Sequence, residues 1–265
     1  GALSVTARPM YQDPFRPLLP DVVEVPYGDA DALGKVLSDG EPSCFVVEPV
    51  QGEAGVVIPP AGYLADVARV CAEHGCLFVA DEIQTGLGRL GRWWGVGDVR
   101  PDMLLVGKAL SGGVVPVAAM VATAEVFRPY DKDPFIHTST FAASPVQMAA
   151  ARASIEALQA EDAVARAAVL GARILAGLAA ADRCGHLIRE VRGEGLLIGV
   201  ELADEALTGE LMLNLLDQRV LVNHSMNNSA VLRLTPPVVL TEPQLEWLLD
   251  GFDRAFTALA RQFPS

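Results

Sequence analysis

Three short apolar segments of this chain each lead into a polar or charged residue. The segments are 43–50 (SCFVVEPV), 76–80 (CLFVA) and 103–106 (MLLV). Glu48 lies near the end of the first, Asp81 follows the second, and Lys108 comes two residues after the third. Continuous apolar runs of this length are typical of strands buried on both faces of a parallel sheet. Because ligands bind outside the carboxyl ends of such strands, these polar side chains are expected to face a site.

A helix is predicted between the first two strands. Pro59 and Pro60 open this segment, and Gly75 stands where a helix C-cap belongs. Between them, apolar residues recur at helical spacing at positions 64, 67, 68 and 71. The order of buried strand, helix and buried strand predicts the α/β class with a mainly parallel sheet.

The second half of the chain has a different element order. Residues 117–123 are a further strand candidate, and the Ala-rich stretch 145–181 is predicted to form two helices or one bent helix. Shorter apolar runs then follow at 196–202, 220–222 and 231–234, before an amphipathic helix that begins near Glu242. This pattern predicts a large α/β domain over residues 1–184 and a small α+β domain over residues 185–265.

Composition narrows the classes of function. The formal net charge of -13 argues against binding to nucleic acid or to an anionic membrane surface. No apolar run approaches the roughly 18 residues of a membrane span, and no signal peptide is visible, so we expect a cytoplasmic protein. The four cysteines lack a CxxC pair and are expected to be buried free thiols. The four histidines have no ligand spacing, so no metal site is expected.

Two nucleotide-binding motifs match only in part. Gly86–Gly91 fits GxGxxG, yet Pro101 and an aromatic stretch follow it rather than a helix whose N-terminus could receive a pyrophosphate. Gly107-Lys108 resembles the end of a P-loop, but Asp102 and Ala109 occupy positions that need Gly and Ser or Thr. We therefore interpret both matches as accidental and disfavour a nicotinamide-dependent dehydrogenase.

A set of motifs spread over almost the whole chain carries a family resemblance. They are 48–53 (EPVQGE), 81–86 (DEIQTG), 107–110 (GKAL), 137–141 (HTSTF) and 233–237 (RLTPP). In this order they resemble the class III aminotransferases, the ornithine, acetylornithine, 4-aminobutyrate and putrescine type of fold-type-I pyridoxal phosphate enzymes. The resemblance implies pyridoxal 5'-phosphate as cofactor, an amine donor, a 2-oxo acid acceptor and a homodimer with shared active sites.

The resemblance also implies roles for the residues that bind the cofactor. Lys108 would form a Schiff base with it and later move a proton, which requires an amine with a lowered pKa. Asp81 would keep the pyridinium nitrogen protonated, although a carboxylate in this position could also cap the following turn. Gln84 would contact the phenolic oxygen. Thr140 would contact the phosphate from the neighbouring subunit, or could simply lie in a turn.

Substrate binding is implied for Glu48, Glu53 and Arg233. Glu53 would pair with Arg233 while an amine donor is bound and would release it to bind the α-carboxylate of a 2-oxo acid. A surface ion pair is the alternative interpretation of these acids. Arg233 lies within an apolar run, where a charge needs a partner.

Departures from the family pattern concern the cofactor phosphate. Residues 142–145 read AASP where relatives usually have Gly-Gly-Asn-Pro, and Ser111 replaces a usual glycine. The family's phosphate-binding loop and ring-stacking aromatic residue would lie upstream of Gly1. We therefore expect this chain alone to bind cofactor poorly and to be inactive without a preceding N-terminal segment, which could be a separate chain.

The function expected from these features is transfer of the terminal amino group of an ω-amino acid or diamine to 2-oxoglutarate. Residues 221–237 and 135–138 are most similar to the putrescine branch of the family. Two alternatives remain open. One is a biosynthetic aminotransferase that acts on an unusual aldehyde or ketone, and the other is a catalytically impaired fragment of the fold.

Overall fold

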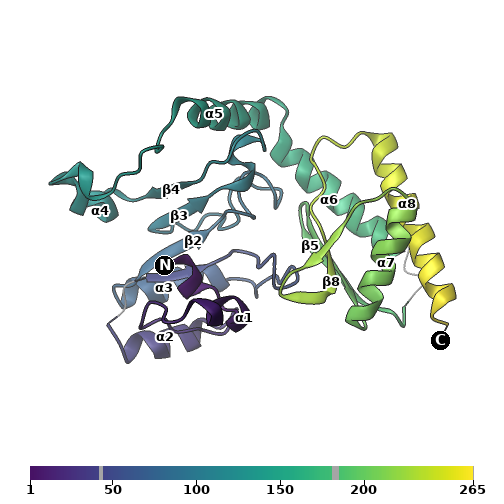
Figure 1. Cartoon of the computed structure of the whole chain (residues 1–265), viewed down its shortest axis with the longest axis horizontal. Helices are drawn as coiled ribbons and strands as arrows, with labels where there is room; N and C mark the ends of the chain where they lie inside the picture. Colours follow the sequence, from purple (N-terminus) through teal and green to yellow (C-terminus); the bar gives the residue numbers. More distant parts are fainter. Residues whose placement is uncertain (42–43, 181–184, 265) are drawn as a thin grey trace.

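The computed structural model describes residues 1–41, 44–180 and 185–264 and contains two four-stranded sheets (Figure 1). In the first sheet the order is β1-β2-β3-β4. Its strands are β1 (Cys44–Val47), β2 (Leu77–Asp81), β3 (Met103–Val106) and β4 (Ala119–Ala122). The first three strands are parallel and β4 is antiparallel to β3, which confirms the prediction of a mainly parallel sheet. The carboxyl ends of β1, β2 and β3 therefore lie at one edge.

Helices α2 (Ala30–Ser38) and α3 (Tyr63–Glu73) pack against each other beside this sheet. Buried residues of both helices join Phe78 of β2 in one hydrophobic core. Helix α3 is the helix predicted from the sequence, and Gly75 beyond its end has a φ of +64°, as a helix-ending glycine requires. Helix α2 was not anticipated, although Asp29 caps it by accepting a hydrogen bond from the backbone N–H of Ala32.

The second sheet is antiparallel throughout, with the order β5-β6-β8-β7. Its strands are β5 (Ile188–Glu194), β6 (Leu197–Leu202), β7 (Asn223–Ser225) and β8 (Asn228–Leu234). Three helices cover one face of it, α6 (Ala163–Ala180), α7 (Glu205–Asp217) and α8 (Glu242–Gln262). They share one core with the sheet, with Phe252 and Phe256 of α8 fully buried in it. A capping box between Thr241 and Gln244 begins α8 at the predicted residue.

Some boundaries differ from those predicted. Of the two arrangements predicted for 145–181, the described residues show two helices, α5 (Pro145–Ala160) and α6, separated at Asp162, whose φ is +47°. The short strand predicted at 220–222 is wrong, because the N–H of Val220 bonds to the carbonyl of Leu215 and closes α7; β7 begins only at Asn223. The proposed domain boundary at residue 184 lies outside the described residues and stays a prediction.

The cysteine prediction is only partly right. Cys71 and Cys76 are buried free thiols, whereas Cys44 is exposed because it lies on β1, the edge strand of the first sheet. Cys184 lies outside the described residues. Within the described ranges no three His, Cys, Asp or Glu side chains converge on a possible metal position. No helix found in these ranges combines the length and the apolar character that crossing a bilayer demands.

The segment between β4 and α5 extends away from both sheets (Figure 1). It contains α4 (Ala124–Phe127) and two 3-10 turns, Arg128–Asp131 and Pro134–Ile136. Large apolar side chains on it face solvent, with Phe135 79% and Phe141 78% exposed. The two sheets themselves are joined by α6 and by loops that carry the site described next.

Candidate active site

Lys108 lies in an unusual backbone conformation at the end of β3. It begins a 3-10 turn, Lys108–Ser111, and its φ of +47° is in the left-handed region. A non-glycine residue there costs about 1–3 kcal/mol, and such strain clusters at functional sites. The turn is held by a hydrogen bond from the N–H of Leu110 to the carbonyl of Gly107. The ammonium of Lys108 donates to Oε1 of Gln84 at 2.8 Å.

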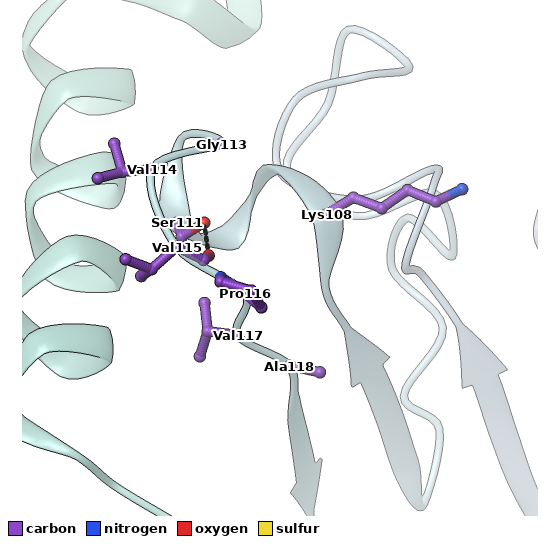
Figure 2. Close-up of a pocket in the computed structure, with 8 residues that line it drawn as sticks. All are labelled: Lys108, Ser111, Gly113, Val114, Val115, Pro116, Val117 and Ala118. Carbon is purple, nitrogen blue, oxygen red and sulfur yellow. Dashed lines mark hydrogen bonds between the residues drawn. The ribbon is translucent and has the colours of Figure 1, made fainter. Parts of the chain in front are cut away.

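Two hollows adjoin Lys108. One, of about 630 Å³, is lined by Ser111 and residues 113–118. Figure 2 shows that the Lys108 side chain extends away from these residues, and that the Ser111 hydroxyl is bonded to the Val115 carbonyl, so we assign no chemistry to this hollow. The other cavity, of about 460 Å³, is lined by Lys108, Gln84 and Arg233 among others. This second cavity brings together residues from three of the motifs in the sequence.

Asp81 is the last residue of β2, and Gln84 lies on the loop that follows it. Oδ1 of Asp81 accepts a hydrogen bond from the N–H of Ile83 at 3.0 Å, so this carboxylate does cap the turn. A carboxylate has two oxygens, and capping with one leaves acceptor capacity on the other. Gln84 packs tightly on the loop after β1, since a Cβ added to Gly52 would lie 2.8 Å from the Gln84 carboxamide. The loops after β1 and β2 thus fix the acceptor that Lys108 contacts.

Glu48 follows β1 and is largely shielded from water. Its Oε2 accepts a hydrogen bond from the N–H of Gly52 at 3.2 Å. Burial raises the pKa of this carboxyl, and the neighbouring carboxylates of Asp81 and Glu53 raise it further, while the Gly52 N–H and Lys108 act in the opposite direction. Glu48 therefore holds a proton more readily than a carboxyl in water does.

Glu53, on the loop after β1, and Arg233, on β8 of the second sheet, form an ion pair. Nη1 of Arg233, on β8, lies 2.5 Å from Oε1 of Glu53, and the two side chains are 13% and 32% exposed. The other carboxylate oxygen accepts from the N–H of Met226 at 3.0 Å, and the Glu53 carbonyl accepts from the N–H of Asn227 at 2.9 Å. The partner that the sequence required for Arg233 is thus present, while the gating role of the pair stays a prediction.

The charges of this cluster meet at Lys108. Loss of hydration lowers the pKa of its ammonium even though part of the side chain reaches solvent. Arg233 lowers this pKa further, and the carboxylates of Glu53, Glu48 and Asp81 oppose the shift. Lys108 consequently loses its proton more readily than a surface lysine, as an amine nucleophile requires.

Thr140 is not part of this cluster. It is exposed on the extended segment between α4 and α5, and no contact found among the described residues links it to Lys108. Its predicted contact to a cofactor phosphate in a neighbouring subunit stays a prediction.

Sequence reasoning missed residues that hold the site loops. Glu82 is 1% exposed and accepts hydrogen bonds from the Thr85 hydroxyl and from the N–H of Val96, which fixes the loop carrying Gln84. Arg192 of β5 donates to the carbonyls of Gly55 and Val56, next to Glu53. The acid after a buried strand was a signal for Glu82, but nothing local pointed to Arg192.

Comparison with known proteins agrees with this geometry. A family model for class III aminotransferases matches residues 1–256. The chain belongs to the class III aminotransferase family. Among solved structures, an ornithine aminotransferase from Toxoplasma gondii matches this class III chain with 33% identity and a TM-score of 0.93, covering 98% of this chain and 62% of that one. An acetylornithine aminotransferase from Elizabethkingia anophelis matches with 36% identity and a TM-score of 0.84, covering 91% and 63%.

A more distant relative extends the comparison. A transaminase from the marine bacterium Virgibacillus has 25% identity and a TM-score of 0.91, covering 98% of this class III chain and 65% of that chain. The chain thus spans less than two thirds of the length of each of these solved chains. These matches confirm the family and the fold-type-I architecture expected from the motifs.

Pyridoxal phosphate is the cofactor of this family, and the residues present fit it. An amine with a lowered pKa, an amide acceptor 2.8 Å from it and a carboxylate at the end of the adjacent strand are the groups that such a cofactor uses. A side chain at position 52 would displace the Gln84 carboxamide, which is the acceptor for Lys108.

Proposed function

We propose that this chain carries the transamination site of a pyridoxal phosphate enzyme that moves the terminal amino group of an ω-amino acid or diamine to 2-oxoglutarate. The observation that carries the proposal is one cavity that holds both Lys108, bonded to Gln84, and Arg233, paired with Glu53. Lys108 with Gln84 suits the binding of a cofactor aldehyde. Arg233 with Glu53 suits the binding of two unlike substrates, an amine donor and a 2-oxo acid.

Lys108 and Asp81 would perform the steps that involve the cofactor. When bound, pyridoxal phosphate supplies an aldehyde that takes up the amino group and a ring that accepts electrons from the substrate carbon. Lys108 would hold the cofactor and then, as a free amine, would move a proton to or from the substrate carbon; its lowered pKa favours release of the ammonium proton. Asp81 would keep the ring nitrogen protonated, and Gln84 would orient the ring.

Glu53 and Arg233 would distinguish the two substrates. A terminal amine donor has no carboxylate near the reacting carbon, so Arg233 remains paired with Glu53 and its charge is neutralised. A 2-oxo acid brings an α-carboxylate that binds the guanidinium in a bidentate manner and displaces Glu53. Glu48 lies close enough to Lys108 for the two to interact electrostatically and would contact the donor at this position.

The donor class is supported by the relatives. Two of the matched structures are named as ornithine and acetylornithine aminotransferases, and ornithine carries a terminal amine. An unusual aldehyde or ketone as acceptor remains the alternative, and a panel of 2-oxo acids and aldehydes separates the two.

The assembly proposed is a cytoplasmic homodimer in which the segment between α4 and α5 crosses to the partner. Exposed Phe135, Ile136 and Phe141 support this because apolar side chains on an extended segment favour contact with another chain. Thr140 lies among them and would reach the partner's cofactor.

Substitution of Lys108, in protein assayed together with the expected preceding segment, tests the proposed function. Lys108→Ala should abolish transamination and the cofactor absorbance that borohydride bleaches, because no other amine lies beside Gln84 among the described residues. Lys35→Ala on α2, exposed and remote from Gln84, is the matched control and should keep full turnover. Unchanged turnover in Lys108→Ala would contradict the proposal. The same assay on the 265-residue chain alone tests the expectation that a preceding segment is needed.

A further inference from the structure

The glycine-rich run Gly86–Gly91 forms a joint between the two sheets. Arg89, within this run, contacts the residue before β6 and the segment just after β8, which lie at the same end of these two neighbouring strands. The Arg89 carbonyl accepts from the N–H of Leu196 at 2.8 Å, and its guanidinium Nη1 donates to the carbonyls of Leu196 at 3.3 Å and Pro236 at 2.7 Å. The run that resembled a nucleotide-binding motif therefore has a different use in this fold.

Packing at this joint is too close to allow sliding. A Cβ added to Gly195 would lie 2.4 Å from the carbonyl carbon of Leu90, and the φ of Gly195 is +53°. A Cβ on Gly91 would lie 2.8 Å from the Cβ of Ala168 on α6. Such contacts are possible only with hydrogen in place of a side chain, so the loop and the second sheet hold one relative position.

The joint connects the two halves of the proposed active site. At one end of the loop, Gln84 contacts Lys108. At the other end, Arg89 binds the carbonyl of Pro236, three residues after Arg233. All four of these polar side chains, Gln84, Arg89, Lys108 and Arg233, line the same cavity.

The surroundings of Arg89 favour a positioning role over direct substrate binding. Within the described ranges it has no carboxylate partner, and burial alone lowers the pKa of its guanidinium. Its Nη1 is directed to backbone carbonyls of the second sheet. A buried cation held by carbonyls in this way stabilises one arrangement of the segments that it joins.

We propose that Arg89 is a positioning residue that fixes Arg233 at a set distance from Lys108 and thereby determines the affinity for the α-carboxylate of the 2-oxo acid acceptor. The inference rests on the proposed function and adds a residue to it. Loss of Arg89 frees the segment after β8 and misplaces Arg233. A displacement near 1 Å at such a site costs on the order of 100-fold in rate.

Arg89→Gln, compared with Arg92→Gln, tests this role. Arg92 lies on the same loop and has the same charge, but it pairs with Glu194 and donates to the carbonyl of Gly95 instead of Pro236. For each variant, the KM and kcat of the two half-reactions are measured separately. Binding of 2-oxoglutarate and 2-oxobutyrate to the cofactor-free protein is measured by calorimetry. Arg89→Gln should weaken the binding of both 2-oxo acids to a similar degree, on the order of 10- to 100-fold. The KM and kcat of the donor half-reaction should stay within a few-fold of the wild-type values.

Several results would overturn the inference. Equal losses in both half-reactions, or equal effects of Arg89→Gln and Arg92→Gln, would show a merely structural role. Weakening confined to the dicarboxylate 2-oxoglutarate would show that Arg89 binds a second carboxylate directly. If Arg89→Gln does not fold, Arg89→Lys, which keeps one donor for Pro236, decides by the same comparison of half-reactions. Wild-type protein that shows no transamination even when assayed together with the expected preceding segment would refute the proposed function, while calorimetry would still compare Arg89→Gln with Arg233→Ala for 2-oxo acid binding.

Discussion

Glu53→Gln should leave Arg233 available to 2-oxo acids at all times, because the ion pair that otherwise neutralises it is lost. The glutamine has nearly the same shape as Glu53, and its carbonyl oxygen can still accept from Arg233, now 2.5 Å away, or from the N–H of Met226, now 3.0 Å away. What the substitution removes is the negative charge that neutralises Arg233. The guanidinium then becomes available to an incoming α-carboxylate without competition from an anion.

The size of the effect follows from the burial of the pair. The hydrogen bond that remains still involves the charged guanidinium, so what the change removes is the attraction between the two opposite charges, which is on the order of 1 kcal/mol for a pair that is partly open to solvent. Glu53 is 32% exposed, so solvent screens part of this interaction. Since 1.4 kcal/mol is about tenfold in affinity, we expect the KM for 2-oxoglutarate to fall by about three- to tenfold. The KM for a diamine donor should rise by a similar factor, because Arg233 would then repel the cation.

Stopped-flow absorbance of the cofactor, recorded separately for each half-reaction, measures both effects. Arg233→Ala should give the opposite pattern, with the acceptor half-reaction damaged far more than the donor half-reaction. Glu242→Gln is the matched control, because it removes one acid from an exposed arginine pair, with Arg173, that joins α8 to α6 away from the site. If Glu53→Gln changes the KM values of the two half-reactions in the same direction and by the same factor, Glu53 and Arg233 do not act as a gate.

Two further predictions concern stability and assembly. Glu48→Gln should raise the melting temperature at pH 7–8. The pKa of Glu48 is raised in the folded chain, mainly by burial, so the protonated carboxyl favours folding. This contribution to stability is lost as pH rises through the folded pKa, whereas the neutral glutamine keeps it. The gain in melting temperature should shrink toward pH 4.5, near the ordinary pKa of this carboxyl. The control Glu41→Gln, at an exposed position, should change the melting temperature little at either pH. An equal gain for Glu48→Gln at both pH values would contradict this reasoning. The double variant Phe135→Ser, Phe141→Ser should sediment as a monomer where the parent protein sediments as a dimer, and an unchanged dimer would exclude this segment from the interface.

Local sequence signals were sufficient for the first sheet and for much of its site. The apolar runs before Glu48, Asp81 and Lys108 predicted β1, β2 and β3, because a strand buried on both faces has to be apolar throughout. The prolines and the glycine around α3 predicted its limits for equally local reasons, since one residue fixes φ and the other tolerates a positive φ.

The second sheet and the helices packed on it were harder to predict, because their hydrophobic patterns are less regular. Strand β5 has charged residues on an edge of its sheet and does not alternate cleanly, so it was missed. Helix α7 was also missed, although Leu211 and Leu215 on it are fully buried. Its burial depends on α8 and β8, which contact it from later in the chain.

The sequence by itself determined the family, the parallel sheet and the alignment of Lys108 with Asp81 and Gln84 at one edge. Only the tertiary structure decided that Arg89 joins the loop of Gln84 to the strand of Arg233, through a hydrogen bond that spans 147 positions of the chain. Hydrophobic periodicity reports which face of a segment is buried, but a hydrogen bond from a side chain to a distant carbonyl leaves no periodic pattern. The identity of that carbonyl depends on how the two sheets pack against each other, and the packing is a property of the whole chain.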